Sequence, residues 1–118
     1  MNDLIAADEV TGTDVFNPDG QKLGRIEKIM IDKISGKALY AIMSFGGFLG
    51  IGSANYPLPW AKLKYDERMR GYVVNITAQT LAGAPSYDSN GKFDWTLEQG
   101  REIEKFYKSS SSFMDHSS

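Results

Sequence analysis

One stretch of the sequence, residues 17–45, constrains the fold more than any other. It opens with Asn-Pro-Asp-Gly and continues as two apolar runs that are separated by Ser35 and Gly36. Proline presets φ at the first central position of a turn and glycine accepts a positive φ, so Pro18 and Gly20 predict a turn. The two apolar runs that follow, residues 22–34 and 37–45, predict a β-hairpin with Ser35-Gly36 at its tip.

The apolar pattern of the first arm of this hairpin predicts a strongly curved strand. Ile29 and Ile31 fall on one face of a strand, whereas Ile26 and Met30 fall on the other. Because side chains alternate strictly, this change of parity requires either burial of both faces or a β-bulge. Gly24 suits a bend or a close approach of two backbones. Curvature of this kind is what closing a small barrel requires.

The rest of the β structure is predicted from shorter signals. Strands are expected over residues 14–17, 55–60, 61–65 and 72–76. Pro57 and Pro59 share one parity, so both missing N–H groups face the same side, which suits a strand that pairs on one side only. The twelve glycines also favour β structure over a helix bundle. The sequence therefore predicts a mainly β fold, a small barrel of five to six antiparallel strands.

The C-terminal third predicts a short helix and a tail. Thr77 can cap a single helical turn. Residues 96–99, Thr-Leu-Glu-Gln, match a capping box that opens a helix to about Lys108, with Ile103 and Tyr107 on its apolar face. The following segment is rich in serine, so we expect it to be disordered. The expected division is a barrel over residues 1–84, a loop and helix packed on it over 85–107, and a tail over 108–118.

The composition excludes several chemistries. The chain of 118 residues has no cysteine, which excludes disulfides, thiolate metal sites and cysteine nucleophiles. His116 is the only histidine and lies in the serine-rich tail, so a serine nucleophile has no base nearby. Asp14, Asp19 and Asp32 show no regular spacing of calcium ligands and are expected at turns and strand ends. We therefore expect no enzyme activity, no catalytic residue, no metal site and no cofactor.

The N-terminus and the overall charge bear on location and partners. Residues 1–10 carry three acids and no apolar run, so they predict neither a signal peptide nor a membrane span, and a cytoplasmic location is expected. The formal net charge is −2, which gives no general attraction to nucleic acid.

Two segments are candidates for binding. The first is a basic cluster over residues 62–70, which could contact RNA by stacking and phosphate pairing, or could be a solvated hairpin end balanced by acids. We favour the solvated end. The second is the glycine-rich loop Gly46 to Gly52, whose apolar side chains either plug the barrel end or form an exposed patch for a partner. This loop lacks the Lys-Ser/Thr ending of a phosphate-binding loop. The basic cluster consists of Lys62, Lys64, Arg68 and Arg70, and the apolar side chains of the loop are Phe48, Leu49 and Ile51.

The order of these segments resembles the PRC-barrel domain family. The similar parts are Gly20, Gly24 and Ile26, the turn from Ile31-Asp32 to Gly36, the loop GGFLGIG, and Leu58-Pro59-Trp60. Two settings of this family are the cytoplasmic part of the photosynthetic reaction-centre H subunit and the C-terminal domain of a ribosome-maturation factor, and many free-standing bacterial members have no assigned activity. The chain shows neither the membrane helix of the first nor the RNA-processing domain of the second, so we expect neither role.

The resemblance implies a small β-barrel used as a binding or assembly module, with no catalytic residues to carry over. The leading hypothesis is therefore a non-catalytic, self-associating protein-binding module, expected as a homodimer. The alternative is an RNA- or ribosome-associated accessory protein that uses the basic cluster. The residues proposed to bind the protein partner are Phe48, Leu49, Ile51, Tyr56 and Trp60.

Overall fold

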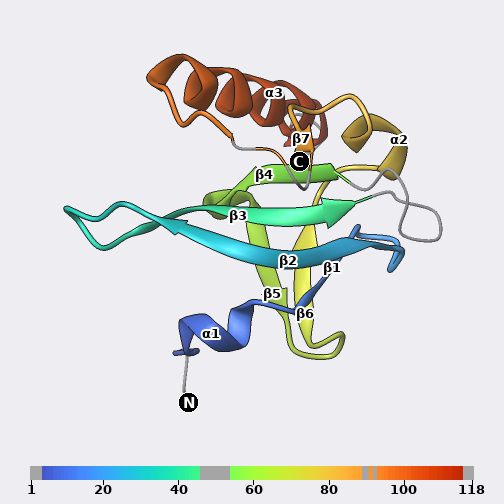
Figure 1. Ribbon diagram of the computed structural model, residues 1–118. Helices are drawn as coiled ribbons and strands as arrows, with labels where there is room; N and C mark the ends of the chain where they lie inside the picture. Colours follow the sequence, from blue (N-terminus) through green and yellow to red (C-terminus); the bar gives the residue numbers. More distant parts are fainter. Residues whose placement is uncertain (1–3, 46–53, 89–90, 92, 116–118) are drawn as a thin grey trace.

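A computed structural model describes residues 4–45, 54–88, 91 and 93–115, with side chains as far as Lys108. Most of the described fold is one seven-stranded sheet (Figure 1). In chain order, the strands are β1 Asp14–Phe16, β2 Lys22–Ile31, β3 Ala38–Phe45, β4 Ala54–Pro59, β5 Leu63–Asp66, β6 Gly71–Val74 and β7 Tyr87–Asp88.

The sheet is open, which corrects the predicted closed barrel of five to six antiparallel strands. The strand order is β5-β6-β1-β2-β3-β4-β7, so β5 and β7 lie at opposite ends and do not pair with each other. β1 and β6 run parallel, whereas the other neighbours are antiparallel. The predicted curvature is present, because β5 and β6 run across the direction of β2 and β3 (Figure 1). The seventh strand, β7, has only two residues, too few for a period-2 pattern to reveal.

The predicted hairpin is confirmed as β2 and β3. The register between these strands shifts between Ile26 and Lys28, so a bulge resolves the parity change in the first arm. Gly24 lies so close to β3 that a Cβ there would collide with the Ser44 carbonyl oxygen, which confirms the predicted close approach. β2 ends at Ile31 rather than Ile34, because the Asp32 N–H closes the turn on the Lys37 oxygen at 2.8 Å.

Pro57 and Pro59 predict a strand that pairs on one side only, and β4 pairs in this way around these two residues. β4 pairs with β3 along its whole length, with Pro57 opposite Ile42 and Pro59 opposite Tyr40. On the other side, β7 pairs only with Ala54 and Asn55. Among the described residues, no second strand pairs with β4 at these prolines, so no outward N–H donor is needed there.

Three α-helices and a 3₁₀ turn, η2 Trp60–Lys62, accompany the sheet in the described part of the chain. The hydroxyl oxygens of Thr77 and Thr96 accept hydrogen bonds from the N–H groups of Thr80 and Gln99, both at 3.1 Å, so both predicted caps form. A full capping box would also have the Gln99 side chain accept from the Thr96 N–H. The Thr96 N–H donates to the Asp94 backbone oxygen at 2.8 Å, so only the bond from the Gln99 N–H to the Thr96 hydroxyl is shown. The α-helices are α1 Ala7–Val10, α2 Ala78–Leu81 and α3 Leu97–Asp115.

Helix α3 is longer than the sequence predicts. Its backbone continues to Asp115, beyond the expected end near Lys108, because serine lowers helix propensity without breaking a helix. His116 and the last two residues lie outside the described residues. The division into segments 1–84, 85–107 and 108–118 stays a prediction. None of the helices in the described part of the chain has the length and apolar content needed to cross a bilayer.

The hydrophobic core joins the sheet to the C-terminal helix. Ile26, Met43 and Leu58 of the sheet are fully buried, and so is Ile103 of α3. Helix α3 lies over β4 and β3 (Figure 1), and it packs against β4. This packing confirms the apolar face predicted for the helix, and it leaves the first turns of α3 beside the distal half of the hairpin.

Candidate functional site

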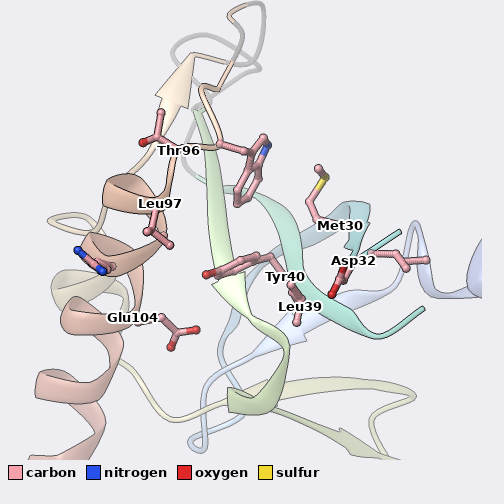
Figure 2. A pocket seen from close by; sticks show the side chains of 11 residues that line it. Met30, Asp32, Leu39, Tyr40, Thr96, Leu97 and Glu104 are labelled. Carbon is pink, nitrogen blue, oxygen red and sulfur yellow. The ribbon is translucent and has the colours of Figure 1, made fainter. Parts of the chain in front are cut away.

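A groove lies between the first turns of α3 and the distal half of the β2–β3 hairpin (Figure 2). Its volume is about 640 Å³, within the range of ligand and peptide pockets. The hairpin supplies one wall and the start of α3, with the chain just before it, supplies the other. The lining residues are Met30, Ile31, Asp32, Leu39, Tyr40, Trp95, Thr96, Leu97, Gly100, Arg101 and Glu104.

Large apolar side chains are exposed along this groove. Leu97 is 75% exposed, Ile31 52%, Leu39 46% and Trp95 36%. The alternation of β3 places Leu39 on the same face as Ala41 and Met43, which are buried, but the core ends before it reaches Leu39. Contiguous apolar surface of this kind marks an interaction site more often than singly scattered residues do.

Aromatic rings support the α3 side of the groove. The Trp95 ring packs on Tyr40 with centroids 5.1 Å apart, and Phe93 packs edge-on against Trp95 at 4.6 Å. The Tyr40 hydroxyl lies against Gly100, where a Cβ would be in ordinary van der Waals contact with it at 3.5 Å. These contacts within the chain fix the position of Trp95, so this wall of the groove is formed without a partner.

Two polar groups in the groove have shifted pKa values. Burial raises the pKa of Tyr40, and the charge of the neighbouring Glu104 carboxylate and a hydrogen bond to it raise this pKa further. The pKa of Asp32 is lowered by hydrogen bonds from the Ile34 N–H at 3.1 Å and the Ser35 hydroxyl at 2.9 Å. Asp32 is therefore charged at neutral pH and holds the hairpin turn, while Tyr40 stays protonated.

The groove thus offers an apolar surface with a few charges at its edges. The described residues contain no group of three or more His, Cys, Asp or Glu side chains that could hold a metal ion. The chemistry that this arrangement supports is the binding of an apolar segment whose flanking charges complement Asp32, Arg101 and Glu104.

Two of the predicted partner-binding residues, Tyr56 and Trp60, do not line this groove. Phe48, Leu49 and Ile51 are outside the described residues. Tyr56 is only 8% exposed and packs edge-on against Phe45, with ring centroids 5.3 Å apart. Trp60 is half-buried and packs on the Tyr72 ring at 5.5 Å. The structure therefore places Tyr56 in the core and Trp60 against it.

The basic cluster is divided between two places on the sheet edge. Lys62 and Lys64 line a shallow hollow along β5, together with Tyr65 and the acidic Asp66. Lys64 is exposed, and Lys62 is half-buried. The two arginines lie in the turn between β5 and β6, where they are exposed and do not line the hollow. They are Arg68 and Arg70.

The groove was missed by sequence reasoning because its walls come from segments far apart in the chain. The available signal was local: Phe93, Trp95 and Leu97 place three large apolar residues around the start of a helix. A helix that packs by Ile103, Phe106 and Tyr107 leaves Trp95 and Leu97 without an obvious place in the core.

The curled sheet, the covering helix and the apolar groove define a small β module whose described part displays an exposed apolar surface. A family model for the PRC-barrel domain matches residues 2–81. The chain belongs to the PRC-barrel domain family, as its sequence resemblance indicates. The match spans the hairpin wall of the groove and ends before α3, so the other wall lies outside the matched residues. A comparison with curated proteins gave no match.

Proposed function

We propose that this protein is a non-catalytic protein-binding module that docks a protein partner in the groove between α3 and the β2–β3 hairpin. The observation that carries the proposal is the exposure of Ile31, Leu39, Trp95 and Leu97 on one surface. Full burial of one such side chain is worth about 1.5–3 kcal/mol. A partner that covers even part of the four therefore gains several kcal/mol.

The charges of the groove support binding rather than catalysis. The Asp32 carboxylate is engaged by the hairpin turn. The half-buried Tyr40 hydroxyl has a raised pKa and stays protonated at neutral pH, so it cannot accept a proton as a base. Membership of the PRC-barrel family supports the same class of function. The cytoplasmic location predicted from the N-terminus is part of this proposal.

Site-specific photo-crosslinking tests the proposal. A photoreactive phenylalanine derivative at position 97 faces the groove, and the same residue at the exposed position 64 on β5 is the matched control. In native cells, we expect protein adducts from position 97 well above those from position 64. Equal yields from the two positions would contradict a docking role for the groove.

An RNA-associated role for residues 62–70 is the second candidate. It is supported by Tyr65, which is 48% exposed beside Lys62 and Lys64 and could stack on a base. Binding through these lysines would weaken steeply with salt. RNA retention at low salt that is lost in a Lys62→Ala/Lys64→Ala variant is expected for this role, and no retention at low salt would rule it out.

A further inference from the structure

We propose that the occupant of the groove is the hairpin tip of a second copy of this chain, centred on Ile34, in a reciprocal two-fold dimer. This inference rests on the proposed docking role of the groove and adds the identity of the partner. It needs two complementary surfaces on one chain, a protruding apolar tip and an apolar groove.

The tip is a single exposed apolar side chain on an ordered turn. Ile34 is 90% exposed, and its N–H is held by the Asp32 carboxylate at 3.1 Å. Gly36 closes the turn with a φ of 79°, and its N–H donates to the Asp32 oxygen at 2.7 Å. The hairpin extends well beyond the rest of the sheet (Figure 1). An ordered tip loses little conformational entropy on docking, which favours binding.

The charges around the tip complement those that line the groove. The tip carries the exposed Lys33 and Lys37 against one carboxylate, Asp32, which also lines the groove of its own copy. The groove is lined by two carboxylates, those of Asp32 and Glu104. One guanidinium, that of Arg101, lines it beside them. Two positive charges and one negative charge thus face two negative charges and one positive charge.

The positions of tip and groove on the same hairpin permit two equal contacts. Ile34 is three residues beyond Ile31, a wall residue of the groove, so the tip lies no more than about 10 Å from it, the length of three extended residues. A two-fold axis beside two antiparallel hairpins places each tip over the groove of the other copy. The contact is then isologous, and it closes at two copies.

Analytical ultracentrifugation of the full chain at micromolar concentration tests the inference. We expect the unaltered protein to form dimers, and we expect Ile34→Asp and Leu97→Asp each to weaken the dimer at least about tenfold, the equivalent of about 1.4 kcal/mol. Both side chains are strongly exposed, so both variants should fold, as circular dichroism will show. Ile5→Asp is the matched control, because Ile5 is exposed (46%) and lies outside the groove and the tip.

Mixing the two variants provides the sharpest test. Ile34→Asp keeps an intact groove, and Leu97→Asp keeps an intact tip, so their equimolar mixture should form heterodimers through one intact contact. If both variants are monomeric and their mixture forms no heterodimer, the copies contact each other through identical surfaces, tip to tip or groove to groove. The tip-in-groove arrangement is then wrong. An unaltered protein that stays monomeric also overturns it. Adducts from position 97 to a different protein would then leave the proposed docking function standing, whereas absent adducts would remove both.

Discussion

At the scale of single residues, Gly24 shows how closely β2 and β3 approach. A Cβ at this position would collide with the Ser44 carbonyl oxygen and lie 2.9 Å from the Met43 Cγ. We expect Gly24→Ala to lower the free energy of unfolding by about 1–3 kcal/mol, because the strands must separate to admit a methyl group. Urea denaturation measures this change. In the control Gly83→Ala, the new Cβ would meet its nearest atom, the Thr80 oxygen, at 3.6 Å, and the effect should stay within about 0.5 kcal/mol.

Tyr40 is a second residue whose environment makes a measurable prediction. Burial is the main cause of its raised pKa, and Glu104 is the lesser cause. Glu104→Gln should therefore lower the pKa of Tyr40 without returning it to the ordinary value. The ultraviolet absorbance of tyrosinate during an alkaline titration, with Tyr40→Phe to identify the signal, measures this shift. An unchanged pKa would show that Glu104 does not act on the hydroxyl in solution.

The tyrosines also set the response of stability to high pH. The pKa values of Tyr40, Tyr72 and Tyr107 are raised above the ordinary value of 10.0, in each case chiefly by burial. The unfolded chain therefore loses these protons first, so their contribution to stability is complete below pH 10 and is lost as pH rises through the folded pKa values. Urea denaturation at rising alkaline pH should show a falling free energy of unfolding. Replacing Tyr40 by Phe should reduce the slope.

At the scale of elements, the start of α3 builds the helix wall of the groove. The Thr96 hydroxyl caps this helix, and Leu97, the most exposed large apolar residue of the groove, is its first residue. We expect Thr96→Ala to lower the free energy of unfolding by about 1 kcal/mol, because the Gln99 N–H loses its acceptor. Urea denaturation measures the loss. Thr96→Ser keeps the hydroxyl and should retain most of the stability, so equal losses in the two variants would contradict the capping role.

The β2–β3 hairpin forms the other wall of the groove. Its turn is defined by local chemistry, with the Asp32 carboxylate accepting from Ile34 and Ser35 and Gly36 supplying the positive φ. These interactions span only a few residues, which is why the sequence predicts the turn. The local sequence of the hairpin does not predict which element the hairpin contacts, because the groove forms only where α3 lies beside it.

At the scale of the whole molecule, α3 belongs to the same core as the sheet. Ile103 is fully buried among sheet residues, although it lies beyond the residues that the family model matches. We expect Ile103→Ala to lower the free energy of unfolding by about 2–5 kcal/mol, whereas Glu102→Ala at an exposed neighbouring position should have little effect. Tryptophan fluorescence and circular dichroism should report one coincident unfolding transition. Separate transitions for helix and sheet would contradict a shared core.

The sequence by itself determined the local features of this protein. The hairpin, the parity change in its first arm, the one-sided pairing at Pro57 and Pro59 and the caps at Thr77 and Thr96 all follow from signals within a few residues. The PRC-barrel family was also evident from the order of such segments. Each of these predictions depends on backbone chemistry that neighbouring residues dictate, such as the missing N–H of proline.

Only the tertiary structure decided the sheet topology and the candidate site. The parallel pairing of β1 with β6 joins Val15 to Tyr72, and no local pattern encodes a contact between positions so far apart. The groove likewise unites Leu39 of the hairpin with Leu97 of α3. From the sequence alone, Leu39 is an ordinary apolar residue of a strand and Leu97 is an ordinary apolar residue of a helix. Their exposure follows from where the core ends, which depends on how all the elements pack together.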